Sequence, residues 1–192
     1  AIIAYAGEFG ISQNPESFAV YGFRKYFTDK DKGSVMRLSQ DGLSEISNFG
    51  MYDYFRDAFL TLGNGRAVGG WDIHNKCYTL SLQPTAPNTT PTTLSFDENV
   101  KGWTSRFSYI PNHIFSLQNN FYSTKNGSIW QHYSAGVNRA NFYGIQYDST
   151  VKTIFNTNPS LVKSFQTINY EGGGNWQMTS LTTNEDKMVN QL

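Results

Sequence analysis

The residues of this chain that could do chemistry do not fall into a catalytic pattern. Its three histidines, His74, His113 and His132, are separated from one another and from carboxylates, and no H-x-x-x-H, H-E-x-x-H or G-x-S-x-G motif occurs. The single cysteine, Cys77, excludes an intramolecular disulfide and a cysteine-based zinc site. We therefore predict no catalytic residue, no metal site and no bound cofactor.

Two groups of carboxylates resemble known sites only in part. Asp29 and Asp31 suggest a calcium loop, but two lysines stand among them and the later oxygen ligands are missing, so an ordinary hairpin turn is favoured. Asp97 and Glu98 could act as a glycosidase pair. Because adjacent residues at a strand end usually point in different directions, a solvated turn is the preferred interpretation.

Glycine and tryptophan give two further candidate sites. The glycine-rich pieces lack the spacing of phosphate-binding loops, so we interpret them as turns or bulges. They are Gly63–Gly65, Gly69-Gly70 and Gly172–Gly174. The four tryptophans could form a sugar-stacking surface, although core or interface packing is their more usual role. They are Trp71, Trp103, Trp130 and Trp176.

The elements that would position these residues are mostly short strands. A hairpin pattern occurs twice, around residues 27–37 and 121–131, with Phe, Gly, Ser and a β-branched residue at matching offsets. This repetition predicts equivalent inward positions for Phe27 and Phe121 and for Val35 and Ile129. Further strands are predicted from turn signals and period-two alternation. They cover about 18–21, 44–47, 69–82, 94–96, 102–110, 142–148, 151–156 and 176–181.

Two helical pieces are also predicted. Apolar residues from Met51 to Leu62 recur at the spacing of one helix face, with Gly63 as the expected C-cap. Asn158-Pro159 would begin a short helix or helical turn. The fold class is therefore mainly all-β, with repeated antiparallel hairpins and one or two short helices. A sandwich or a propeller-like arrangement, closed or incomplete, fits this pattern.

The domain organisation is predicted from one low-complexity stretch. Residues 83–93 contain three prolines and five threonines, which predicts an extended surface loop or linker. We expect a first β unit over 1–82, this linker over 83–93, and a second β unit over 94–192. The absence of an initial methionine suggests a segment of a longer polypeptide.

Composition limits the classes of partner. The formal charge is zero and charged residues make up 16% of the chain, so nothing indicates nucleic-acid binding. No stretch approaches the roughly 20 apolar residues that a membrane-spanning helix needs, so membrane insertion is not expected. Aromatic residues make up another 16%, with many Asn, Thr, Ser and Gly between them, which suits half-buried strands.

Several short sequence segments, in their order along the chain, resemble large virion structural proteins of tailed bacteriophages, as in marine T4-like cyanophages and crAss-like gut phages. The resemblance extends from about Gly10 to Gly172 and implies a tail, neck or baseplate-associated component, without catalytic residues to transfer. The segments that carry it are Asn14–Ser17, Tyr26–Asp29, Gly33–Ser39, Asp41–Ser47, Gly50–Phe55, Gly69–Asp72, Leu94–Trp103, Lys125–Gly127, Asn141–Gly144 and Lys163–Gly172.

Three functions follow as hypotheses. The leading one is a non-enzymatic virion component that works by subunit assembly, oligomeric within the particle and bound to other virion proteins. The alternative is a module that binds a host carbohydrate or receptor through exposed Trp and Tyr. The third is a glycan-cleaving tail enzyme, which would need two facing carboxylates roughly 5–10 Å apart.

Overall fold

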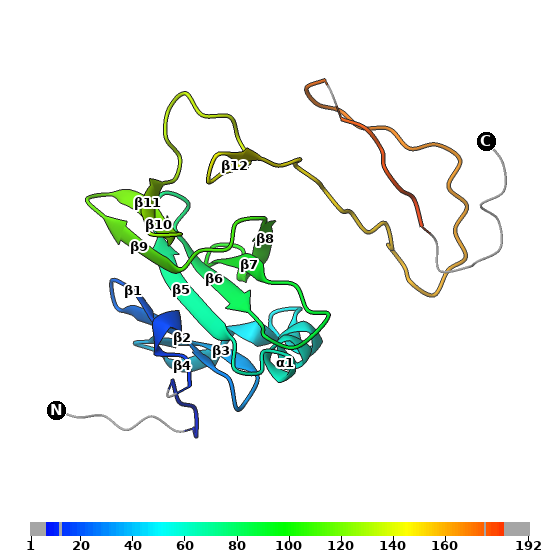
Figure 1. The fold of residues 1–192 in the computed structure, drawn as a ribbon. Coiled ribbons are helices and arrows are strands. Elements are labelled where there is room, and N and C mark those ends of the chain that lie inside the picture. The colour runs from blue at the N-terminus through cyan, green and yellow to red at the C-terminus, as the bar shows by residue number, and fades with distance from the viewer. Residues whose placement is uncertain (1–6, 12, 175, 183–192) are drawn as a thin grey trace. The chain divides into compact units, whose positions relative to one another are not determined.

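A computed structural model describes residues 7–11, 13–174 and 176–182 of the chain. The chain divides into two compact units, Ala1–Thr150 and Val151–Leu192. Over the described residues it contains thirteen strands in four antiparallel sheets and one α-helix, and the sheets do not close into a barrel (Figure 1). The prediction of a mainly β fold is confirmed.

The first sheet is a four-stranded meander in which each strand pairs with the next one along the chain. Its strands are β1 (Ala19–Tyr21), β2 (Arg24–Asp29), β3 (Ser34–Ser39) and β4 (Gly42–Glu45). Short 3-10 turns at Pro15–Ser17 and Ile46–Asn48 flank it, and the helix α1 (Tyr52–Leu60) follows. The predicted helix is therefore confirmed, and it buries Phe55 and Phe59 on one face.

The central sheet is a second four-stranded meander, and it is covered on both faces. It consists of β5 (Arg66–Asp72), β6 (Cys77–Gln83), β7 (Thr92–Asp97) and β8 (Gly102–Phe107). One face packs Trp71, Tyr78 and Leu80 into the main core with the first sheet and α1. The other face places Val68 against Ile114 and Phe121 of the third sheet.

Two glycines allow both layers to approach β5 closely. A Cβ on Gly69 would lie 2.1 Å from the carbonyl oxygen of Ser17, and a Cβ on Gly70 would lie 2.4 Å from Cγ2 of Ile114. No larger residue fits at either position without displacing a neighbouring layer. The interpretation of Gly69-Gly70 as a turn or bulge was therefore wrong, because both lie in the middle of a buried strand.

The third sheet has three strands, β9 (His113–Leu117), β10 (Asn120–Lys125) and β11 (Ser128–Gln131). A two-residue turn at Asn126-Gly127 joins β10 to β11, and both residues have positive φ, as a tight hairpin turn requires. A small hairpin of β12 (Asn141–Phe142) and β13 (Ile145–Gln146) follows. The hairpin predicted over 142–148 and 151–156 is thus shorter than expected, and 151–156 form no strand.

The predicted equivalence of the two repeated hairpins is wrong. The first has a four-residue turn between Asp29 and Ser34, whereas the second has a two-residue turn. In the first hairpin Val35 is buried while Phe27 is only half-buried on the opposite face. In the second, Phe121 is 1% exposed and Ile129 is 67% exposed. Although the same residue types stand at the same offsets, the two hairpins turn different positions towards the core.

Residues 84–91 form the mostly exposed connection between β6 and β7, whereas Gln83, Thr92 and Thr93 of the predicted linker belong to these strands. The strands β6 and β7 on either side of this connection pair directly, and the two compact units of the chain divide after Thr150. In the described residues of the second unit, 157–161 form a bend and turn rather than a helix, and 176–181 form no strand. These residues lack the packing partners that would stabilise an isolated element.

Candidate functional site

Asp97 and Glu98 are bound to different parts of the structure. The Asp97 carboxylate accepts a hydrogen bond from the backbone N–H of Asn99 at 2.7 Å. Glu98 accepts from the Tyr26 hydroxyl at 2.5 Å and forms an ion pair with Arg37 at 2.8 Å. Burial and the Glu98 carboxylate both raise the pKa of Tyr26. Glu98 therefore ties the central sheet to the first sheet.

The candidate calcium loop is a hairpin turn that its own hydrogen bonds hold together. Asp29 accepts hydrogen bonds from the backbone N–H groups of Gly10 and Lys32, so its carboxylate fixes the local chain. The Lys30 ammonium donates to the backbone carbonyl of Gly63. Among the described residues, no group of three His, Cys, Asp or Glu side chains is placed to hold a metal ion.

One polar cluster was missed by sequence reasoning. The Ser123 hydroxyl lies 2.7 Å from Nε2 of His132 and 2.8 Å from the Tyr143 hydroxyl. Close by, the Tyr133 hydroxyl donates to Asp72 at 2.5 Å. These residues come from β5, β10 and the segment after β11, so only the tertiary structure brings them together.

The geometry of this cluster does not suit nucleophilic catalysis. Ser123 is 0% exposed, so a substrate cannot reach it. Burial lowers the pKa of His132 to about 4, which leaves the imidazole a weak base. Asp72 accepts hydrogen bonds from Tyr133 and from the backbone N–H groups of His74 and Asn75. The cluster instead anchors the segment after β11 to the central sheet.

The tryptophans differ in burial: Trp71 is buried, Trp103 is half-buried against the main core, and the other two are exposed. Trp71 stacks on Tyr21 with ring centroids 4.3 Å apart, and Trp103 donates its indole N–H to the Ile46 carbonyl at 3.1 Å. Trp130, which is 38% exposed, and Trp176, which is 49% exposed, remain open to solvent in different units. A sugar-stacking surface built from all four tryptophans is therefore excluded.

The described residues of the second unit expose an unusual number of apolar side chains. We call residues 151–182 the C-terminal apolar segment. It contains no helix or strand among its described residues. Its exposed large apolar side chains are Val151, Ile154, Phe155, Leu161, Val162, Phe165, Ile168, Tyr170, Trp176, Met178 and Leu181. Such a density of exposed apolar groups marks an interaction surface rather than a reaction site.

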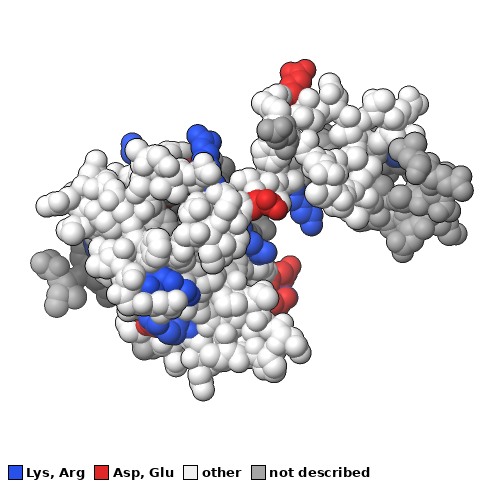
Figure 2. Space-filling model, turned by 45° about the horizontal axis from the view of Figure 1, so that its top comes forward, with Lys and Arg blue, Asp and Glu red and all other residues white. Residues whose placement is uncertain are grey.

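Charge on the described surface is sparse. On the face drawn in Figure 2, positive and negative residues stand among uncharged ones, in agreement with the net charge of zero. None of the helices in the described residues is long and apolar enough to cross a membrane. The arrangement is therefore suited to contacts between uncharged protein surfaces.

A family model of known proteins matches part of the chain. Residues 137–191 match the family model of the Crassvirus muzzle protein C-terminal domain. The matched residues include the whole C-terminal apolar segment. No curated protein matches the chain. The match supports the crAss-like part of the resemblance and indicates a structural component of a phage virion, which interacts with other virion proteins.

Proposed function

We propose that the chain works as a non-enzymatic component of the tail, neck or baseplate region, and that it acts by assembling with neighbouring virion proteins. The observation that carries this proposal is the C-terminal apolar segment, which exposes eleven large apolar side chains over residues 151–182. In water these groups raise the free energy of the isolated chain. A neighbouring subunit that covers them would remove this cost.

The exposed apolar area is sufficient for a specific interface. Burying the exposed half of the four aromatic side chains alone would remove roughly 300–500 Å² from water. The aliphatic side chains add to this, and an interface of standard size needs about 800 Å² on each partner. Ile154, Phe155 and Phe165 also line an open hollow of about 460 Å³, into which a partner side chain can insert.

The lack of regular structure in this segment also supports assembly. An extended chain leaves backbone N–H and C=O groups free to pair with a sheet edge of a partner, as in recognition by strand addition. The strand β11 is an edge strand of the first unit, with Ile129 exposed on one face and Trp130 on the other, and offers a second edge for such pairing. Covering such edges within a particle also prevents uncontrolled pairing between chains.

The proposal is tested by placing charges in the C-terminal apolar segment. Val162→Asp together with Phe165→Asp in the full-length protein should reduce its incorporation into purified particles at least ~tenfold, because burying unpaired carboxylates is unfavourable. Quantitative mass spectrometry of the particles measures incorporation. Lys152→Gln, which changes an exposed lysine of the same segment, is the control. Wild-type incorporation of the double variant would contradict the proposal.

A carbohydrate- or receptor-binding role is the second candidate, because Trp130 remains exposed beside Tyr143, with ring centroids 5.5 Å apart. With Trp71 and Trp103 in the core, this surface is smaller than the sequence suggested. The third candidate, glycan cleavage, has less support, because the Glu98 carboxylate already accepts hydrogen bonds from the Tyr26 hydroxyl and the Arg37 guanidinium.

A further inference from the structure

A small polar pocket lies on the central sheet of the first unit. Its volume is about 260 Å³, several times the ~30 Å³ that one water occupies in the liquid. The turn after β5, the first residue of β6 and the strands β7 and β8 supply its walls. The lining residues used in the argument are Asn75, Ser95, Asp97, Thr104, Ser105 and Phe107.

An irregularity in strand pairing opens this pocket. Ser95 pairs with Ser105 and the next residue, Phe96, pairs with Trp103, so Thr104 is an extra residue on β8. Such a bulge bends the strand and changes the direction of the side chains beside it. The Thr104 hydroxyl then lies 3.4 Å from that of Ser95. Hydroxyl groups from two neighbouring strands therefore converge on one space.

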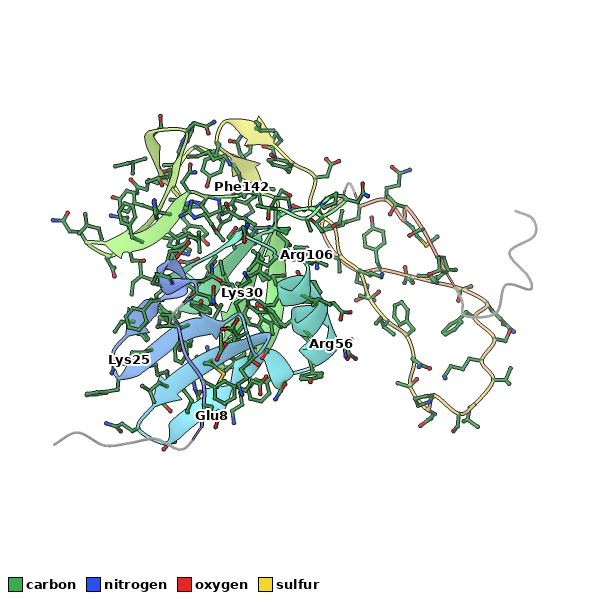
Figure 3. All side chains as sticks on the ribbon, turned by 60° about the horizontal axis from the view of Figure 1, so that its bottom comes forward. Glu8, Lys25, Lys30, Arg56, Arg106 and Phe142 are labelled. Carbon is green, nitrogen blue, oxygen red and sulfur yellow. The ribbon has the colours of Figure 1, made fainter. Side chains whose placement is uncertain are left out.

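The lining favours a neutral, hydroxyl-rich ligand. Asp97 supplies a carboxylate, whereas no Lys or Arg lines the pocket, which excludes phosphates and other anions. Arg106, the basic residue on β8, lies over the Tyr54 ring at 5.4 Å and so is directed to the side of α1 (Figure 3). A single carboxylate is also too little charge for a calcium site. Burial raises the pKa of the Cys77 thiol, which also lines the pocket, to about 12, so this group is not a nucleophile.

The polar and apolar walls match the two kinds of surface on a sugar ring. Carboxylate, amide and hydroxyl groups can accept and donate hydrogen bonds to sugar hydroxyls. Phe107 provides an apolar wall, and its ring centroid lies 5.4 Å from that of Tyr109 and 6.3 Å from that of Phe142. Asn75 is held in place because its amide donates to the Tyr133 hydroxyl at 2.6 Å.

We propose that this pocket binds one neutral monosaccharide unit of a surface glycan, with Asp97 accepting hydrogen bonds from its hydroxyls and Phe107 packing on its C–H face. The inference does not depend on the proposed assembly function, because the pocket lies wholly in the first unit. A ligand of this size in a shallow pocket should bind with a dissociation constant of about 1 mM.

Ligand-observed NMR with the full chain tests the proposal. The probes are D-glucose, D-galactose, D-mannose, L-rhamnose and N-acetyl-D-glucosamine, each titrated separately. At least one should show saturable binding that Asp97→Asn weakens ~tenfold or more, since the hydrogen bonds to a charged acceptor are lost. Asp41→Asn, which changes an exposed turn carboxylate outside the pocket, should bind as the wild type does.

A second variant keeps the test decisive if Asp97→Asn alters the turn at Asn99. Thr104→Val removes an exposed hydroxyl at the bulge and should also weaken binding. Circular dichroism of each variant reports whether it is folded. The proposal is overturned if no probe shows saturable binding, if binding is equal in both folded pocket variants and the wild type, or if only calcium binds.

Discussion

At the residue scale, the buried His132 links stability to pH. Its imidazole contacts the Ser123 hydroxyl and packs beside Phe121, with ring centroids 4.9 Å apart. Burial lowers its pKa to about 4 in the folded chain, from an ordinary value of 6.5. Between these two values the unfolded chain binds more protons than the folded one. Stability is therefore retained above pH 6.5 and is lost as the pH falls towards 4.

We expect the free energy of unfolding to decrease by roughly 1–2 kcal/mol from this histidine between pH 7 and pH 5. Urea unfolding at the two pH values measures this difference. His132→Gln keeps a hydrogen-bonding group near Ser123 but cannot take up the proton, so its decrease should be smaller. His113→Gln, which changes an exposed histidine, should keep the wild-type decrease. An identical decrease in the wild type and His132→Gln would refute this account.

At the element scale, the hairpin of β10 and β11 has one face towards the core and one towards solvent. In the hairpin of β10 and β11, Phe121 packs with Val68 and Ile114, whereas Ile129 points to the opposite side. Phe121→Ala should lower the free energy of unfolding by ~3–5 kcal/mol, because it leaves a cavity between two sheets. Ile129→Ala is the matched control and should stay within about 0.5 kcal/mol of the wild type. Chemical denaturation checks both, and comparable losses would show that the assigned faces are wrong.

The elements with local sequence signals could be predicted, whereas features that depend on tertiary packing could not. Most strands between Ala19 and Gln131, although not β9, and the helix α1 were predicted, because period-two alternation, helical periodicity and turn residues are local signals. The close approach at Gly69 and Gly70 was not, since it depends on which layers cover β5. The Asn158-Pro159 signal gave only a turn, because nothing packs on it to continue a helix. The cluster of Ser123 and His132 likewise arises from strands that meet only in the fold.

At the scale of the whole molecule, the two units differ in how far they bury their apolar side chains. The first unit buries them between three layers, with Tyr26, Trp71 and Tyr78 stacked in the main core. The second unit leaves its apolar side chains exposed over the described residues 151–174 and 176–182. The first unit therefore holds its own structure, while the second gains most from contact with neighbours in a virion.

Hydrogen exchange of residues 151–182 is the measurement that tests this account most directly, performed on the free protein and on purified particles. In the free protein these backbone amides should exchange rapidly, because the described ones lie in no helix or strand. In the particle, burial against neighbouring subunits should slow their exchange at least ~tenfold, while the amides of β5 and β6 remain slow in both. Equal, rapid exchange of residues 151–182 in the particle and in the free protein would contradict the assembly role.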